Sequence, residues 1–373
     1  MILMKKILIN ATNLNEGGGV QVATSFLKDL TSLEHLKDIE WSVYVSPAVQ
    51  RNLNEIFFDK KFFIEYQIVE PKEISFLNSY KLNQYDVVFT VFGPMFLPLY
   101  RGRHISGFAQ PWVIYPVEDV LKKFSFIKQL FFKFKYSLIS FVFRHADILV
   151  VESSHIKNLL IKKGFTNQIA VVENAVSSVF FNEEEWKEIN TDVFDSNKIN
   201  IGVLSGSYPH KNLDFVVKLA WKLENTYPNT FNFIFTIRPD KFKMLTHGIQ
   251  ISSLRNLGLI QITQCPDFYR QIDAMILPSL LECFSITPYE AMLMKRVIFL
   301  SDREFFKESC DSHAFYFDPL SIDQAEKVLS DWFFDTCQSK RVSHINAAHE
   351  FVINKSWSVT KANSYMNLLL ESL

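Results

Sequence analysis

The stretch Pro278–Asp302, PSLLECFSITPYEAMLMKRVIFLSD, decides the fold that this chain is expected to adopt. It predicts the end of a buried strand, then a loop that carries Glu282, a helix over residues 287–294, and a further strand over residues 297–300. A strand, a helix and another strand in this succession form the repeating unit of parallel α/β sheets. The segment therefore predicts an α/β protein.

Two carboxylates, Glu282 and Glu290, flank the expected start of this helix. Free N–H groups at a helix start attract anions, and carboxylates accept hydrogen bonds from sugar hydroxyls. A phosphate held between two carboxylates in this way suits a nucleotide-sugar. Two alternatives need no ligand: Thr287-x-x-Glu290, with Pro288 at the first helical position, is also a capping box, and a lone Glu282 is also an ordinary solvated loop residue.

The segment resembles the retaining glycosyltransferases of the GT-B fold, in particular family 4 (the glycosyltransferase group 1 domain) of the bacterial surface-polysaccharide type. That family reads roughly P-S-x-x-E-G-F-G-x-x-x-x-E-A-M-A, then a strand and S-D. The residues retained here are Pro278, Ser279, Glu282, Phe284, Glu290, Ala291, Met292, Ser301 and Asp302. Cys283 and Ser285 replace the usual glycines and leave less room near the phosphates, and Lys295-Arg296 stands where Gly-x-Pro is common.

The composition sets the frame for this resemblance. A chain of 373 residues predicts two domains, and a net charge of −1 gives no field that favours nucleic acid. Four cysteines without metal spacing or a paired pattern fit a reducing cytosol. We expect neither a signal peptide nor a membrane span, because no window reaches about 18 uncharged apolar residues.

A run of three glycines, residues 17–19, follows an expected strand at 6–10 and precedes an expected helix at about 20–31. Strand, glycine turn and helix let the backbone approach a ligand closely, although a merely flexible turn has the same composition. The G-x-G-x-x-G pattern is absent, which disfavours a dinucleotide-dependent oxidoreductase. The resemblance implies that Gly18 and Gly19 lie over the donor phosphates or the acceptor.

The passage His104–Pro116 is expected to run from a strand into a loop. Related enzymes often place a His-Asp pair here, whereas this sequence has Ala109-Gln110. Gln110 is the acceptor-side candidate, because its amide hydrogen-bonds sugar hydroxyls but is no base at neutral pH. Plain loop polarity explains Gln110 equally well.

Residues 121–145 contain many aromatic and basic residues and no acidic one. The basic residues are Lys122, Lys123, Lys128, Lys133, Lys135 and Arg144. The pattern predicts a helix that is apolar around much of its circumference. It indicates either a helix on an anionic membrane surface or a core-facing helix with lysines at its rim.

The second half of the chain begins with a strand at residues 199–204 and a loop that carries Lys211, just before a helix at about 213–224. A cation there costs a few tenths to about 1 kcal/mol against the helix dipole, and a bound diphosphate would remove that cost. An exposed loop lysine is the alternative. The resemblance makes Lys211 the phosphate-binding lysine. The arginine that often accompanies it is missing, with Ser207 near its place and Arg238 as a substitute.

The resemblance implies two doubly wound, Rossmann-like domains that face each other across a cleft. Residues 1–178 form the acceptor-side domain, 179–198 a linker and 199–355 the nucleotide-sugar domain, and a C-terminal helix at 356–373 packs back on the first domain. A strand at Leu259–Thr263 is expected where relatives hold the nucleotide base.

The activity that the resemblance implies is transfer of a hexosyl group (EC 2.4) with retention to a lipid-linked saccharide, in surface-polysaccharide, lipopolysaccharide or O-antigen synthesis. No metal is expected, because D-x-D is absent. Glu282 and Lys211 are the catalytic candidates. The expected donor site comprises Gly18, Gly19, Ser207, Lys211, Arg238, Phe284, Ser285, Ile286, Thr287 and Glu290. The expected location is cytoplasmic, at the inner face of the cytoplasmic membrane. A GT-B-like nucleotide-sugar epimerase and a catalytically silent nucleotide-sugar binder are the alternatives.

Overall fold

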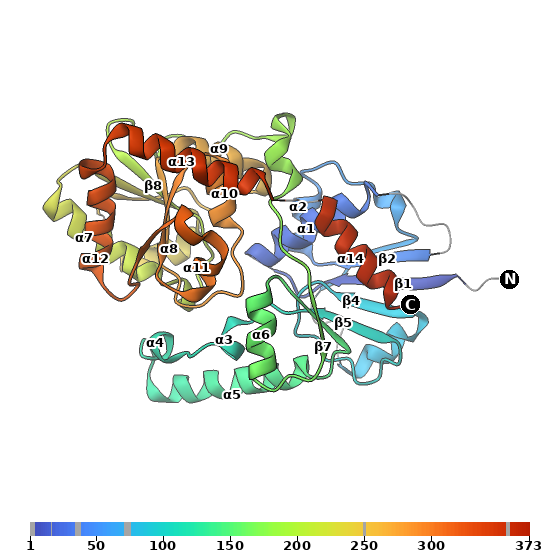
Figure 1. The fold of residues 1–373 in the computed structure, drawn as a ribbon. Coiled ribbons are helices and arrows are strands. Elements are labelled where there is room, and N and C mark those ends of the chain that lie inside the picture. The colour runs from blue at the N-terminus through green and yellow to red at the C-terminus, as the bar shows by residue number, and fades with distance from the viewer. Residues whose placement is uncertain (1–3, 16, 34–38, 71–75, 249–250, 356–358) are drawn as a thin grey trace. The chain divides into compact units, whose positions relative to one another are not determined.

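Two parallel β-sheets organise the chain (Figure 1). The computed structural model describes residues 4–15, 17–33, 39–70, 76–248, 251–355 and 359–373. By its contacts the chain divides into one unit of Met1–Ser178 with Trp357–Leu373 and a second of Val179–Ser356. The expected linker, residues 179–198, thus belongs to the second unit and contains a 3-10 turn at Glu183–Glu185.

The first unit is built on a seven-stranded sheet in the order β3-β2-β1-β4-β5-β6-β7. Its strands are β1 Lys5–Ala11, β2 Ile39–Val45, β3 Glu65–Ile68, β4 Val87–Thr90, β5 Arg103–Gly107, β6 Ile148–Val151 and β7 Gln168–Val171. Its helices are α1 Gly18–Leu30, α2 Pro47–Leu53, α3 Pro111–Ile114, α4 Glu118–Leu121, α5 Phe126–Phe143, α6 Ser154–Lys162 and α14 Val359–Glu371. The chain order reverses between β1 and β4, as in doubly wound folds.

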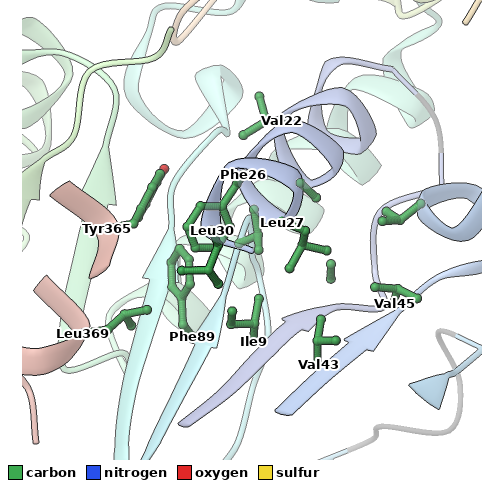
Figure 2. Close-up of a cluster of buried hydrophobic side chains, with 14 of the residues drawn as sticks. Ile9, Val22, Phe26, Leu27, Leu30, Val43, Val45, Phe89, Tyr365 and Leu369 are labelled. Carbon is green, nitrogen blue, oxygen red and sulfur yellow. The ribbon is translucent and has the colours of Figure 1, made fainter. Parts of the chain in front are cut away.

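The C-terminal helix α14 is part of the first unit's core. Tyr365 packs its ring 4.9 Å from Phe26 of α1 and 5.2 Å from Phe89 of β4, and Figure 2 shows Leu369 on the same side of the helix. Lys361 is buried on this helix and donates to Asn174, and burial lowers the pKa of Lys361 to about 8. The first residues of the expected helix, 356–358, lie outside the described part of the chain.

The second unit holds a six-stranded sheet in the order β10-β9-β8-β11-β12-β13. Its strands are β8 Ile199–Val203, β9 Phe231–Phe235, β10 Leu254–Asn256, β11 Ala274–Leu277, β12 Val297–Ser301 and β13 Phe315–Phe317. Its helices are α7 Leu213–Thr226, α8 Pro239–Leu245, α9 Cys265–Gln271, α10 Thr287–Leu293, α11 Glu304–Cys310, α12 Ile322–Ser330 and α13 Gln338–Ile353. All the strand pairs of this sheet are parallel.

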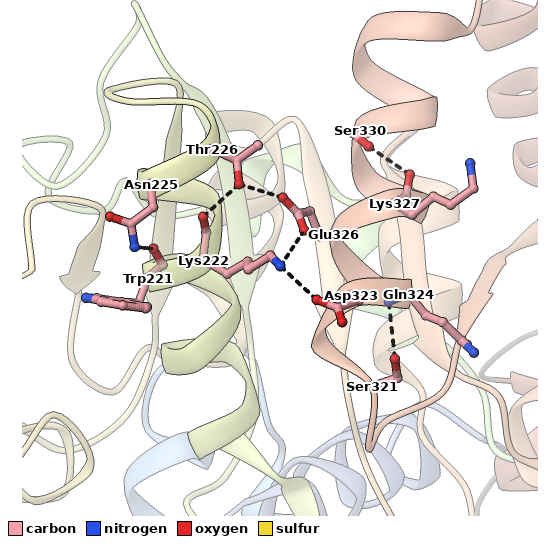
Figure 3. A network of polar contacts seen from close by, with 10 residues as sticks. All are labelled: Trp221, Lys222, Asn225, Thr226, Ser321, Asp323, Gln324, Glu326, Lys327 and Ser330. Atoms are coloured by element: carbon pink, nitrogen blue, oxygen red, sulfur yellow. Dashed lines mark hydrogen bonds and ion pairs between the residues drawn. The ribbon is translucent and has the colours of Figure 1, made fainter.

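Helices α7 and α12 cover one face of the second sheet and contact each other. Lys222 lies 2.8 Å from Asp323 and 3.4 Å from Glu326, which also accepts from Thr226 at 2.7 Å (Figure 3). Such solvated contacts contribute little to stability. The stability of the pair comes mainly from buried apolar residues beneath it, which include Leu219, Leu223, Ala325 and Leu329.

One predicted strand is wrong. Residues 259–263 do not form a strand, because Gly258 has φ +87° and Leu259 is 67% exposed. Gln261 and Gln264 instead form a capping box around a 3-10 turn at Ile262–Gln264. The edge strand β10 lies earlier in the chain. Among the described residues, no helix has the length and apolarity needed to cross a membrane.

Candidate active site

The crossing point of the second sheet positions the candidate site. From β8 the chain builds outward to β9 and β10, then returns to β11 on the other side of β8. In open α/β sheets, ligands bind outside the carboxyl ends of strands at such a reversal. Lys211 follows β8 and Glu282 follows β11, so both stand in the two loops that meet there.

Lys211 and Glu282 form an ion pair in this position. The Nζ of Lys211 donates to Oε1 of Glu282 at 2.5 Å, and the side chains are 18% and 7% exposed. Charges withdrawn from water are held in place chiefly by a partner of opposite sign. The structure thus brings together the two residues predicted to be catalytic, although they are 71 positions apart.

Backbone contacts hold the two loops together around this pair. The N–H of Leu280 donates to the carbonyl of His210 at 2.7 Å. Asn212, in the left-handed conformation at φ 57°, donates from its amide to the carbonyls of Pro278 at 3.2 Å and Pro319 at 3.0 Å. Asparagine tolerates this conformation better than most residues. Asn212 was not among the predicted site residues, although an asparagine directly before a helix is a signal visible in the sequence.

His210 precedes the lysine and contributes no positive charge. Its ring stacks on Tyr208 at 5.6 Å. Desolvation, with the ammonium of Lys211 next to it, lowers the pKa of His210 to about 3. The imidazole is therefore neutral at physiological pH, and Lys211 is the cation that this turn supplies.

Glu290 lies in α10 as a buried acid, 4% exposed. Its Oε2 accepts from the hydroxyl of Tyr269 at 2.9 Å, and this hydroxyl also lies 3.3 Å from the carbonyl of Thr287. Burial raises the pKa of Glu290 to about 7, against the opposing effect of the Tyr269 hydrogen bond. Nothing in the sequence marked Tyr269 as the partner, because it stands in a different helix.

The capping-box interpretation of Glu290 is wrong. Helix α10 begins at Thr287 with Ile286 as its N-cap, and no side chain caps it. Pro288 accordingly occupies the second helical position rather than the first. The ligand-contact interpretation of Glu290 stays a prediction.

The remaining predicted donor residues of the second unit are partly or fully exposed, and two of them have partners of their own. Phe284 stacks on Tyr289 at 5.7 Å, and Ser285 and Ile286 are partly exposed beside it. Ser207 is exposed. Arg238, the predicted substitute for the missing arginine, pairs with Asp240 at 3.0 Å, and its side chain is 54% exposed.

The predicted residues of the first unit lie near the carboxyl ends of its strands. Gly18 and Gly19 are the first two residues of α1 and follow β1, and a Cβ added at Gly18 would meet no atom within 4 Å. The residue that needs to be a glycine is Gly17, the N-cap of α1, with φ 78°. Gln110 follows β5 and is the half-buried N-cap of α3, without a side-chain cap hydrogen bond.

A cavity of about 960 Å³ lies along the edge strand β10. Phe242 and Lys243 of α8 line it together with Leu254, Arg255 and Leu257. None of the predicted site residues contributes to its lining. We therefore place the candidate site at the Lys211–Glu282 pair and not at this cavity.

A comparison with models of protein families matched residues 184–351, and the description of the matching family is "Glycosyl transferases group 1". All the matched residues lie in the second unit. The match includes Lys211, Glu282 and Glu290 and covers less than half of the chain. The region that resembles this family thus contains the ion pair at the crossing point of the sheet. A comparison with curated proteins found no match.

Solved structures with the same architecture span nearly the whole chain. HepE of Anabaena in complex with UDP-glucose matches with a TM-score of 0.70 and 14% identity, over 99% of this chain and 100% of that one. Sucrose-phosphate synthase from Thermosynechococcus elongatus matches with a TM-score of 0.67 and 11% identity, over 98% of each chain. TarM of S. aureus, in complex with fondaparinux, α-GlcNAc-glycerol and UDP, matches with a TM-score of 0.67 and 11% identity, over 98% of this chain and 99% of that one. With the two parallel sheets, these likenesses confirm the predicted α/β class and GT-B fold.

A pH-dependent change in stability is expected from Glu290. Its pKa of about 7 in the folded protein exceeds the usual 4.5, so the folded state binds more protons between these values. Stability should therefore fall, by about 2–3 kcal/mol, as pH rises from 4.5 to 7. Glu290→Gln keeps an acceptor for Tyr269 but cannot ionise, so its melting temperature should change less between pH 5 and pH 8 than that of the wild type.

The exposed Glu184 provides the matched control, and Glu184→Gln should follow the wild-type profile. Parallel profiles for Glu290→Gln and the wild type would show that Glu290 does not titrate in this window.

Proposed function

We propose that this chain is a retaining glycosyltransferase that moves a hexosyl group from a nucleotide-diphosphate sugar to a lipid-linked saccharide. The observation that carries the proposal is the Lys211–Glu282 ion pair at the chain reversal of a group 1 domain. One cation and one acid, held where open α/β sheets bind ligands, match the two ends of a sugar diphosphate. The structures of HepE and TarM hold UDP-glucose and UDP, which makes uridine donors the first candidates.

In the proposed reaction the bond between the anomeric carbon and the diphosphate oxygen breaks, and a bond from the acceptor hydroxyl to the same carbon forms on the same face. The proton of the acceptor hydroxyl passes to the departing phosphate oxygen. Negative charge grows on the diphosphate during this step, and the ammonium of Lys211 stabilises it. No metal ion is needed in this scheme, because Lys211 supplies the positive charge.

Glu282 has two tasks in this scheme. Before the donor binds, it neutralises Lys211 across the 2.5 Å contact. When the diphosphate of the donor pairs with Lys211 in place of Glu282, the Glu282 carboxylate becomes free to accept hydrogen bonds from the hydroxyls of the transferred sugar. Glu290 is proposed to hold the ribose hydroxyls, and Gly18 and Gly19 to lie over the donor phosphates or the acceptor. Gln110 is proposed to serve the acceptor side. The proposed setting is surface-polysaccharide assembly at the inner face of the cytoplasmic membrane.

Thermal-shift measurement against UDP-, GDP- and dTDP-sugars tests the donor class. A ligand that binds only the folded state stabilises it by about 2.7 kcal/mol at 100 times its Kd, so one base series should raise the melting temperature. Product analysis then separates the alternatives. An epimerase releases an isomerised sugar without any acceptor, a silent binder leaves the donor intact, and a transferase consumes it in the presence of a saccharide acceptor. If no nucleotide-sugar shifts the melting temperature, the proposal fails.

A further inference from the structure

Helix α5 turns an apolar face outward. Seven of its large apolar side chains are between 50% and 80% exposed: Phe126, Ile127, Leu130, Phe131, Phe134, Leu138 and Phe141. At about 100° per residue they fall within an arc of about 140° on one side of the helix. Of the 18 residues of α5, all of them described, only Phe143 is buried, so most of the helix surface does not face the core.

The opposite side of α5 packs on the first unit. The ring of Tyr136 stacks on that of Trp112 in α3, with centroids 4.8 Å apart and an angle of 8° between the planes. The ring centroid of Phe132 lies 5.3 Å from that of Trp112, and the centroid of Phe143 lies 4.7 Å from that of Phe108. Figure 1 shows α5 beside α3, and the two helices are in contact. These contacts fix the rotation of the helix, so the seven-residue arc faces away from its own unit.

Basic residues border this arc. Lys133 lies about 20° beyond one edge and Lys135 about 40° beyond the other on a regular helix. Both are exposed, as are Lys122, Lys123 and Lys128 near the start of α5. Residues 120–146 contain no aspartate or glutamate. An apolar strip with a lysine beyond each edge matches a membrane surface, where hydrocarbon lies beneath anionic headgroups.

We propose that the seven-residue arc of α5 inserts into the headgroup region of an anionic phospholipid bilayer, with the helix parallel to the membrane plane. The apolar side chains enter the acyl boundary, and the flanking lysines contact lipid phosphates. Exposed apolar patches of this kind mark interaction sites, and the charge pattern selects lipid over an uncharged partner. The inference rests on the proposed function for its biological setting only, because it would bring a lipid-linked acceptor and the enzyme to one surface.

Vesicle sedimentation with the full-length protein tests the inference, without donor or acceptor. The wild type should bind phosphatidylcholine vesicles that contain phosphatidylglycerol, bind pure phosphatidylcholine more weakly, and dissociate as salt is raised. Phe134→Ser with Leu138→Ser should weaken binding at least about tenfold. Lys133→Gln and Lys135→Gln should each weaken it about fivefold, and only for the anionic vesicles.

Phe57→Ser is the matched control, since Phe57 is 84% exposed in the same unit but lies outside α5. It should bind vesicles like the wild type. Because the substituted residues are exposed, the melting temperatures of all variants should stay near the wild-type value. Donor hydrolysis in solution should also stay unchanged in the α5 variants, which separates a failure of this inference from a failure of the proposed reaction.

Three results would overturn the inference: no binding of the wild type to anionic vesicles, equal binding by the wild type and the Phe134/Leu138 variant, or self-association that the α5 substitutions abolish without any vesicle binding. The last result would assign the arc to a second copy of the chain.

Discussion

Lys211→Met is expected to lower the rate of sugar transfer by about 100- to 1000-fold, the usual loss when a preorganised group that stabilises a leaving charge is removed. Lys211 supplies the positive charge of its turn, because the neighbouring His210 is neutral. The variant should also bind nucleoside diphosphates more weakly. Steady-state kinetics and calorimetric titration with UDP, GDP and dTDP measure the two effects.

Stability has to be separated from chemistry in this experiment. Without Lys211, the Glu282 carboxylate is left 7% exposed with its ion-pair partner gone, which should lower the melting temperature. The double variant Lys211→Met/Glu282→Gln removes both charges and should recover stability but not transfer. Lys218→Met is the matched control, because Lys218 lies on the next helix in a solvated pair with Asp214. A Lys211→Met enzyme with wild-type turnover would exclude Lys211 from the reaction.

Glu282→Gln is expected to lower the rate of sugar transfer and to raise the affinity for free nucleoside diphosphate. Transfer should slow by about 10- to 100-fold, because the charged hydrogen bonds to the sugar hydroxyls are lost. Binding of the free nucleoside diphosphate should become tighter, because the phosphate no longer displaces Glu282 from the Lys211 ammonium at 2.5 Å. The same titration and kinetics that serve Lys211→Met report both.

The increase in nucleotide affinity distinguishes this scheme from a purely structural role of Glu282. A carboxylate that only supported the fold would weaken both binding and turnover when replaced, through a looser loop. Unchanged or weaker binding of UDP, GDP and dTDP by Glu282→Gln would therefore show that the ion pair does not regulate access to Lys211. Glu184→Gln, an exposed change in the same unit, should alter neither quantity.

Local sequence patterns predicted the helix and the strand that follow Glu282. The expected helix at 287–294 and strand at 297–300 correspond to α10 Thr287–Leu293 and β12 Val297–Ser301. Apolar runs bounded by proline and charged residues carried that information. The strand expected at residues 259–263 is not formed. A short apolar run occurs both in strands and in turns, and here it follows Gly258, whose positive φ interrupts the extended backbone.

Helix α13, in contrast, was not predicted from the sequence. Its residues, Gln338–Ile353, are mostly polar, and only Ala348 and Val352 are buried, one turn apart. So narrow an apolar strip gives little periodic signal. The sequence likewise left open which side of α5 packs on its own unit, because an apolar pattern around much of a helix does not single out one face. The stacking of Tyr136 on Trp112 of α3 shows which side that is.

By itself the sequence determined which residue types stand at the ends of which strands: a lysine after β8, a glutamate after β11, and a second glutamate in the following helix. Only the tertiary structure decided that the first two form an ion pair and that Glu290 turns to Tyr269 instead of capping its helix. The reason is physical. Side-chain type and spacing are local, whereas the partner of a charge depends on strand order, and here the crossing from β10 back to β11 places two distant loops side by side.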